Sequence, residues 1–198
     1  LAELCRSFSH CGRTRGSAWY DHNVLGSNLR MTEFQAAVLM GQLSRLPAQV
    51  ERREANAALI DQQIADLPGV RRLAPAPEMT RRSYHMVIFR IDQQQLGLSR
   101  SRFLEALHAE GVPATEGWYR PLYRNAVFQN ANEGPVHGIR APLADRGIDY
   151  RNVSCPVCEA VCEDAVWIPQ HVLLAEPAAI EQLGAAIRKV VGQASLLA

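Results

Sequence analysis

Hydrophobic residues recur at helical spacing over several long stretches of the chain, whereas strand-like alternation is confined to short ones. The longest helical stretch covers residues 32–67, and Pro47 inside it is expected to bend the helix or restart it. Further helices are predicted over residues 1–9, 99–110, 155–164 and from Pro177 onward. The chain is therefore expected to consist mainly of helices around a small sheet.

The clearest strand signal lies in residues 83–92, where apolar side chains alternate onto both faces. A strand that is apolar on both sides is expected at the centre of a sheet. Shorter strands are predicted at 112–115 and 166–168, and residues 124–154 have the composition of a long irregular segment. The order of strand, helix and strand predicts the α/β class, or more strictly α+β, because the sheet is small.

A polar loop leads directly into the long helix. Thr32 is a suitable N-cap, and Gln35 three residues later completes a capping box. Ser27, Asn28 and Arg30 precede this helix start, whose free N–H groups and partial positive charge favour an anion such as a phosphate. The plainer alternative is an Asx-turn at Asn28 and a surface ion pair at Arg30, and the spacing alone favours that alternative.

The cysteines Cys155, Cys158 and Cys162 have a spacing that can chelate zinc or an iron–sulfur cluster, with His171 as a candidate fourth ligand. However, Cys158 and Cys162 fall on a predicted helix, where buried cysteine packs as a small hydrophobic residue. We therefore expect no metal site. The chain has five cysteines, an odd number, which fits free thiols and a cytoplasmic protein better than a disulfide framework.

Residues 117–123 form an aromatic loop that contains Trp118, Tyr119 and Tyr123 together with Arg120. Such a loop can line a pocket for a sugar or another ring. It can equally belong to the core, and the sequence leaves these two interpretations open.

Composition excludes several broad classes. The 198 residues carry a net charge of +1, which gives no global field for nucleic acid or an anionic membrane. No apolar run approaches the roughly 18 residues of a transmembrane helix, and the first residues lack the pattern of a secretory signal. The chain starts with Leu1 rather than Met, so we expect it to be part of a longer protein.

Beyond these patterns, the chain resembles the pyridoxal-phosphate sugar aminotransferases of the DegT–DnrJ–StrS kind. The most recognisable string is Gly26-Ser-Asn28-Leu-Arg30-Met31, which is followed by Gln35-Ala-Ala37 and Gln42-Leu43. Similar motifs continue along nearly the whole chain: Gly111-Val-Pro113, Tyr119-Arg-Pro-Leu-Tyr123, and Cys155-Pro156 with Glu159. The segment at 170–174 is most similar to the branch that acts on keto-cyclitols or aminobenzoate-type precursors.

This resemblance implies the fold of a type I, aspartate-aminotransferase-like enzyme, of which the chain would be the C-terminal part. Residues 1–31 would be the end of the large cofactor-binding domain, including a loop that crosses the dimer. Residues 32–73 would be a long bent linking helix. Residues 74–198 would be the small C-terminal α+β domain, with a mostly antiparallel sheet flanked by helices. Such enzymes work as homodimers with shared active sites.

The same resemblance implies roles for individual residues. Asn28 would bind the phosphate of pyridoxal 5′-phosphate in the neighbouring subunit, and Arg30, Tyr119 and Tyr123 would lie near the substrate. Glutamate or glutamine would donate an amino group to a keto-sugar, often nucleotide-linked, or to a keto-cyclitol. The only lysine, Lys189, lies in the final predicted helix. The lysine that carries the cofactor is therefore expected upstream of this chain, which would contain no catalytic residue and be inactive alone.

Two other classes remain open. A non-catalytic α+β module for ligand binding or assembly would explain the small sheet and the missing lysine equally well. The cysteine triplet leaves a metal or cluster protein as the third class. If the chain is part of an aminotransferase, residues 1–27 would rest on a large domain outside it, so we expect exposed apolar surface and self-association.

Overall fold

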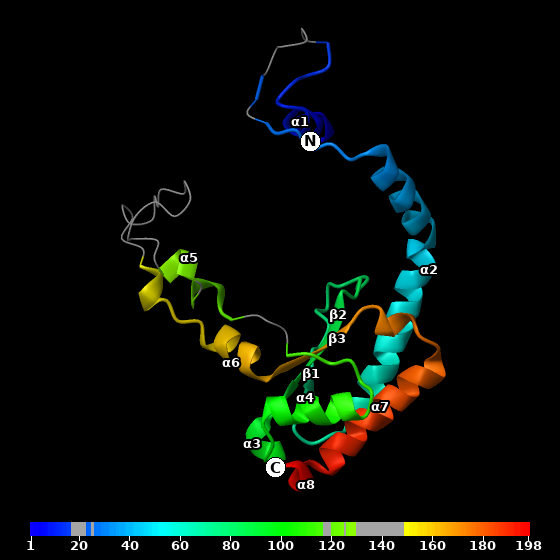
Figure 1. Cartoon of the computed structure of the whole chain (residues 1–198), viewed down its shortest axis with the longest axis vertical. Coiled ribbons are helices and arrows are strands. Elements are labelled where there is room, and N and C mark those ends of the chain that lie inside the picture. Colours follow the sequence, from blue (N-terminus) through cyan, green and yellow to red (C-terminus); the bar gives the residue numbers. More distant parts are fainter. Residues whose placement is uncertain (17–22, 25, 117–119, 125, 130–148) are drawn as a thin grey trace. The chain divides into compact units, whose positions relative to one another are not determined.

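The computed structural model describes residues 1–16, 23–24, 26–116, 120–124, 126–129 and 149–198 (Figure 1). These residues form two compact units, residues 1–48 and residues 49–198. The aromatic loop residues Trp118 and Tyr119 lie outside the described residues. The division into three functional segments stays a prediction.

The first unit contains α1 (Ala2–Ser9) and the beginning of α2 (Glu33–Ile64). A tight turn follows α1, in which Gly12 has a positive φ angle of 79°. Glycine is required there because a Cβ would lie 1.7 Å from the carbonyl oxygen of Val24. Both helices occur where the hydrophobic spacing predicts them, and α2 continues through Pro47 without a new start.

The second unit contains a three-stranded sheet in the order β1–β2–β3, and both strand pairs are antiparallel. The strands are β1 (Val70–Arg72), β2 (Met86–Ile91) and β3 (Ala165–Pro169). The central place of β2 confirms what its two apolar faces predict. The expected small antiparallel sheet with helices, and with it the α/β class, is also confirmed.

The other helices of this unit are α3 (Gln93–Leu96), α4 (Arg100–Ala109), α5 (Ala126–Gln129), α6 (Pro156–Asp164), α7 (Pro177–Gly192) and α8 (Ala194–Leu197). Short 3-10 turns occur at η1 (Leu122–Arg124), η3 (Tyr150–Asn152) and η4 (Val172–Leu174). α4 packs against α7, and Figure 1 shows the two side by side. None of the helices in the described part of the chain is long and apolar enough to cross a membrane.

One hydrophobic core joins the helices of the second unit to its sheet. Phe89 of β2 and Phe103 of α4 meet edge to face, with ring centroids 6.5 Å apart, and Ile60 of α2 is fully buried in the same cluster. The end of α6 is tied to the sheet because the Arg90 guanidinium on β2 donates two hydrogen bonds of 2.6 Å to the Asp164 carboxylate. This ion pair therefore holds the end of α6 against the sheet.

The strand predicted at residues 112–115 is wrong. Of residues 112–115, all of which the structure describes, only Thr115 pairs with a strand, in an isolated bridge to Trp167 of β3. The amide of Val112 instead donates to the carbonyl oxygen of Leu107 at 2.9 Å, so the segment begins as the closing turn of α4.

Candidate functional site

Asn28, the predicted phosphate ligand, lies on the loop between α1 and α2 and is exposed. Its backbone pairs with His10 in an isolated antiparallel bridge. The amides of Ser27 and Leu29 donate to carbonyl oxygens in the last turn of α1 at 2.8 and 3.1 Å. Among the described residues nothing pairs with the Asn28 carboxamide, which therefore remains available to a ligand.

The glycine that opens the same motif has a steric role. At Gly26, a Cβ would lie 2.5 Å from both the Phe8 carbonyl oxygen and the Gly12 amide nitrogen. The loop thus approaches the end of α1 so closely that only glycine fits. This contact anchors the loop two residues before Asn28.

Arg30 lies beside the same histidine as Asn28. Its Nη2 is 3.0 Å from His10 Nδ1, and because a guanidinium only donates, the ring nitrogen is the acceptor. Arg30 is exposed and has further N–H groups that this contact does not use. Asn28 and Arg30 together therefore supply hydrogen-bond donors of the kind that bind a phosphate or a carboxylate.

The helix start that follows is already capped. The Thr32 amide donates to Gln35 Oε1 at 2.9 Å, and the Gln35 amide donates to Thr32 Oγ1 at 3.2 Å, which confirms the predicted capping box. The box occupies backbone N–H groups that the sequence analysis left for an anion. An anion at this helix start would therefore have to use the N–H groups that the box leaves, together with side chains such as those of Asn28 and Arg30.

The first half of α2 is apolar on several sides and exposed. Phe34 is 87% exposed, Met40 73% and Leu43 67%, and at 100° per residue these side chains leave the helix in different directions. A helix that is hydrophobic all round is normally a buried one. This segment therefore has the composition of a buried helix without neighbours, among the described residues, that bury it.

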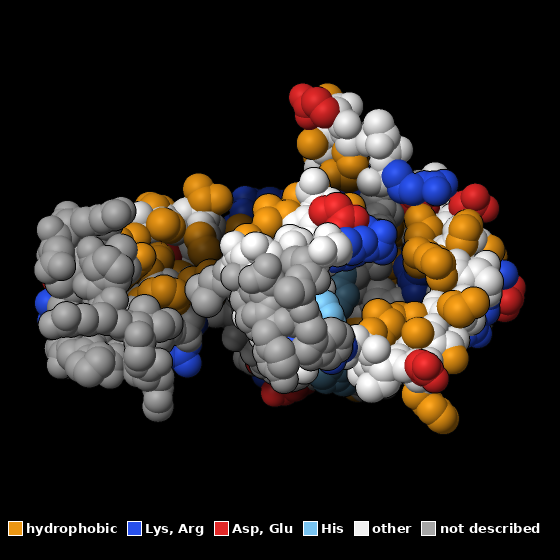
Figure 2. Space-filling model, turned by 90° about the horizontal axis from the view of Figure 1, so that it is seen from above, with side chains coloured by type: hydrophobic (Ala, Val, Ile, Leu, Met, Phe, Trp, Pro, Cys, Tyr) orange, Lys and Arg blue, Asp and Glu red, His pale blue; other side chains and the backbone are white. Residues whose placement is uncertain are grey.

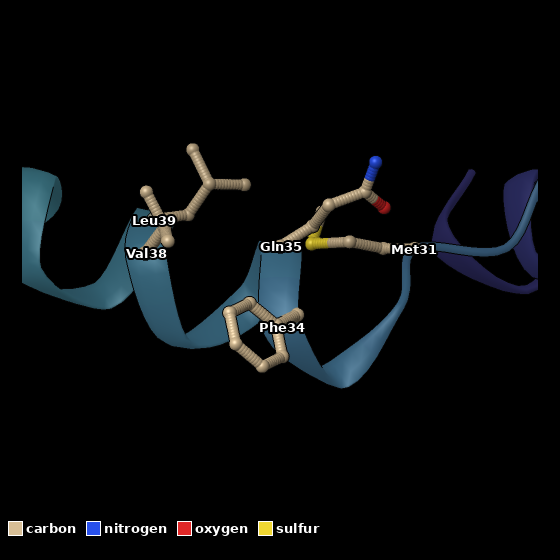
Figure 3. Close-up of a pocket in the computed structure, with 5 residues that line it drawn as sticks. All are labelled: Met31, Phe34, Gln35, Val38 and Leu39. Carbon is tan, nitrogen blue, oxygen red and sulfur yellow. The ribbon is translucent and has the colours of Figure 1, made fainter.

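Two open apolar depressions mark this first unit. One, of about 570 Å³, is lined by Met31, Phe34, Gln35, Val38 and Leu39. Figure 3 shows Met31 beside Gln35, with Val38 and Leu39 one turn further along the helix and Phe34 projecting separately. The polar member, Gln35, is engaged in the capping box. The depression suits an apolar protein surface better than a polar substrate.

The second depression, of about 520 Å³, lies between α1 and the loop that follows it. Leu4, Phe8 and Leu29 line it and are each about half exposed or more. Exposed hydrophobic side chains are drawn orange in Figure 2. Leu4 and Phe8 thus confirm the predicted exposed apolar surface for the described part of residues 1–27, and the self-association expected with it stays a prediction.

Tyr123, the other described substrate-site candidate, lies in η1 and donates its hydroxyl to Glu159 of α6. The Arg124 guanidinium pairs with the same carboxylate at 2.8 Å. The hydrogen bond to Glu159 raises the pKa of Tyr123, and the same bond lowers the pKa of Glu159. The phenol is therefore held neutral beside a charged carboxylate. Tyr119, which the sequence groups with Tyr123, lies outside the described residues.

The three clustered cysteines are not packed as buried side chains. Cys155 and Cys158 are exposed, and Cys162 is half-buried. Burial raises the pKa of the Cys162 thiol, with the neighbouring Cys158 adding to the effect. Across the residues that the structure describes, no three His, Cys, Asp or Glu side chains are placed to hold a metal ion.

Comparison with known proteins gives consistent results. The model of the DegT/DnrJ/EryC1/StrS aminotransferase family matches residues 1–188. A Micromonospora echinospora protein, provisionally named L-glutamine:3-amino-2,3-dideoxy-scyllo-inosose aminotransferase, is 38% identical over 192 residues, which cover 93% of this chain and 44% of that protein. The L-glutamine:2-deoxy-scyllo-inosose aminotransferase of the same organism is 34% identical over 169 residues, covering 84% of this chain and 39% of that protein.

A solved structure matches the fold over a similar share of the chain. The crystal structure of 3-amino-5-hydroxybenzoic acid synthase superposes with a TM-score of 0.73 at 28% identity, covering 97% of this chain and 47% of that one. The chain thus spans less than half the length of the relatives it matches. Because the family model extends over residues 1–188, the chain belongs to the DegT/DnrJ/EryC1/StrS aminotransferase family.

Proposed function

We propose that the complete protein is a pyridoxal-phosphate-dependent aminotransferase that moves an amino group from L-glutamine to a keto-cyclitol, and that this chain is its C-terminal part. The names of two relatives, which give glutamine as donor and a scyllo-inosose derivative as acceptor, support this choice. Glutamate as donor and a keto-sugar as acceptor form the wider alternative within the family.

Residues 1–48 would be the part that reaches the active site of a neighbouring subunit in a homodimer. The observation that carries this proposal is the exposed Asn28 carboxamide, which has no partner among the described residues and lies on the same anchored loop as Arg30. The surrounding apolar depressions, on α1 and on α2, support an environment formed by other protein surface. A homodimer and the remainder of each subunit would supply that surface.

Pyridoxal 5′-phosphate, when bound, supplies the electron sink for amino transfer. Asn28 and Arg30 fit its phosphate as an uncharged and a charged donor, and they would hold and orient it. Lys189 does not fit a covalent role, because its Nζ is ion-paired with Glu110 Oε1 at 2.8 Å in the second unit. We therefore place the lysine that carries the cofactor outside these residues, and expect Lys189→Met to leave cofactor loading unchanged.

The test uses the complete protein and the variant Asn28→Ala. We expect its Kd for pyridoxal phosphate to rise at least about tenfold, equivalent to about 1.4 kcal/mol, in an absorbance titration. Amino transfer from L-glutamine to a keto-cyclitol should fall in parallel at limiting cofactor. Asn23→Ala is the matched control, since Asn23 is exposed but donates to Thr14 Oγ1 at 2.9 Å within its own unit.

Two results would count against the proposal separately. Unchanged cofactor affinity in Asn28→Ala would show that Asn28 does not bind the phosphate of the cofactor. Wild-type protein that loads cofactor but transfers no amino group to any keto-cyclitol would refute the acceptor and leave the phosphate role standing.

A further inference from the structure

We propose that Glu159 is a positioning residue that fixes Tyr123 and Arg124 together, so that Tyr123 meets the keto-cyclitol through its aromatic ring and not through its hydroxyl. This inference rests on the proposed function, because that function places Tyr123 near the substrate. It goes beyond that function by assigning a role to a residue that does not itself touch the substrate, and by naming the part of Tyr123 that does.

Four groups from two segments converge on the Glu159 carboxylate. The Tyr123 hydroxyl donates to Oε1, and the Arg124 guanidinium pairs with Oε2 at 2.8 Å. The Cys155 amide and the Ser154 hydroxyl reach Oε1 at 3.0 and 3.4 Å. One side chain on α6 thus holds both η1 and the segment that leads into α6.

A second set of contacts joins η1 to α5 and to η3. The Gln129 amide nitrogen donates to the carbonyl oxygen of Tyr123 and lies 3.5 Å from that of Tyr150. The rings of Phe128 and Tyr150 pack with centroids 5.2 Å apart. The backbone of Tyr123 is therefore restrained as well as its hydroxyl, and the residue has little freedom to redirect its phenol toward a ligand.

The charges of the pair favour the same conclusion. An ionised carboxylate is an acceptor only, so the Tyr123 proton is directed at Glu159 and is not available to a substrate oxygen. Glu159 has a lowered pKa and Tyr123 a raised one, so both keep these states near neutral pH. The Arg124 guanidinium carbon lies over the Tyr123 ring, 5.8 Å from its centroid, so the two side chains form one unit. The part of the ring that Arg124 does not cover and the unused N–H groups of Arg124 suit the C–H groups and hydroxyls of a cyclitol.

The experiment compares four substitutions in the complete protein: Glu159→Gln, Tyr123→Leu, Tyr123→Phe, and Glu163→Gln as control. Glu163 lies one turn further along α6, is exposed, and loses the same charge. We expect Glu159→Gln and Tyr123→Leu to raise the KM for the keto-cyclitol at least about fivefold while the KM for glutamine stays within about twofold. Tyr123→Phe should raise it less than Tyr123→Leu, because it loses the hydrogen bond to Glu159 but keeps the ring.

A spectroscopic measurement on the 198-residue chain separates this inference from the proposed function. Tyrosine ionisation followed by ultraviolet absorbance should show one late-titrating phenol that Tyr123→Phe removes, that Glu159→Gln shifts to lower pH, and that Glu163→Gln leaves in place. If Glu159→Gln left the titration unchanged, the positioning role would be refuted. If Tyr123→Leu left the KM for the keto-cyclitol unchanged, the ring would not carry the contact and the inference would be refuted. A wild-type enzyme without cyclitol activity would refute the proposed function alone.

Discussion

The two compact units of this chain differ in how far their hydrophobic side chains are buried. In residues 49–198, Phe103 and Ile60 are 0% exposed, within a core that joins helices to the sheet. In residues 1–48, Phe34 is 87% exposed, and no hydrophobic side chain among the described residues of this unit is buried. The second unit therefore encodes its own core, whereas the described residues of the first leave their hydrophobic side chains exposed, as the proposed contact with other protein surface requires.

In the first unit, main-chain groups form hydrogen bonds although the hydrophobic side chains around them stay exposed. The capping box of Thr32 and Gln35, and the bridge between His10 and Asn28, satisfy main-chain groups locally. These contacts involve neighbours within the unit and hold the loop without a core. The proposed role in a neighbouring subunit needs both features, a loop held by main-chain contacts and an apolar surface that other protein can cover.

The largest expected effect is a contrast between two phenylalanines. Phe103→Ala should lower the free energy of unfolding of the 198-residue chain by about 3–5 kcal/mol, because it leaves a cavity in the core. Phe34→Ala should change it by no more than about 0.5 kcal/mol, because that ring is exposed. Urea unfolding followed by circular dichroism measures both, and equal costs would contradict the contrast between the units.

A smaller contrast involves two asparagines. Asn56 is 2% exposed, and its amide nitrogen donates to the carbonyl oxygens of Leu173 and Ala175 at 2.8 and 2.9 Å. Asn56→Ala should cost about 1–3 kcal/mol, because it removes the donor to the buried Leu173 carbonyl, whereas the Ala175 carbonyl still accepts from Arg52. Asn23→Ala, at an exposed position of the first unit, should cost less than about 0.5 kcal/mol in the same urea experiment.

The capping box offers a test confined to the first unit. Thr32→Ala should destabilise the start of α2 by about 1 kcal/mol, since the Gln35 amide loses its acceptor. Hydrogen exchange at the first turn of α2 should accelerate several-fold, with Thr32→Ser as the control that keeps the hydroxyl. Unchanged exchange in Thr32→Ala would show that this box does not hold the helix start.

The smallest expected effect is a pH dependence in the second unit. The hydrogen bond from Arg188 lowers the pKa of Asp66. A depressed carboxyl pKa gives stability that is present above the unfolded value and is lost as the pH falls through the folded one. Acid unfolding of Asp66→Asn below about pH 4 should therefore be slightly less steep than that of the wild type. Identical acid profiles would show that the exposed pair contributes nothing.

The sequence predicts best those elements where a local signal and a burial pattern agree. The Ser99 hydroxyl accepts from the Arg102 amide at the start of α4, and the helix buries Phe103 as its spacing predicts. β1 escapes prediction because it is three residues long and carries Arg71 and Arg72, which give no alternating apolar pattern. Its strand conformation comes from pairing with β2, and only a tertiary contact specifies it.

α3 is a different kind of omission, because its signal was readable. Asp92 caps it by accepting from the Gln95 amide at 3.0 Å, and Gly97 closes it with a positive φ angle of 65°.

The cluster around Glu159 is harder to predict. Tyr123 and Glu159 are 36 positions apart in the chain, and only folding brings them together. Asn28 and Arg30, by contrast, share a short loop whose motif is visible in the sequence, although their roles stay predictions.

Mixed dimers test most directly whether Asn28 serves the neighbouring subunit. A complete protein lacking its cofactor lysine would be combined with Asn28→Ala under conditions that allow subunits to exchange, and activity would be measured at a pyridoxal phosphate concentration that leaves Asn28→Ala largely unloaded. If Asn28 acts across the dimer, each mixed dimer has one intact site. Since half of randomly assorted dimers are mixed, about a quarter of wild-type activity should return. If the mixture stays as inactive as its two components, Asn28 serves its own subunit or none, and this account of residues 1–48 is contradicted.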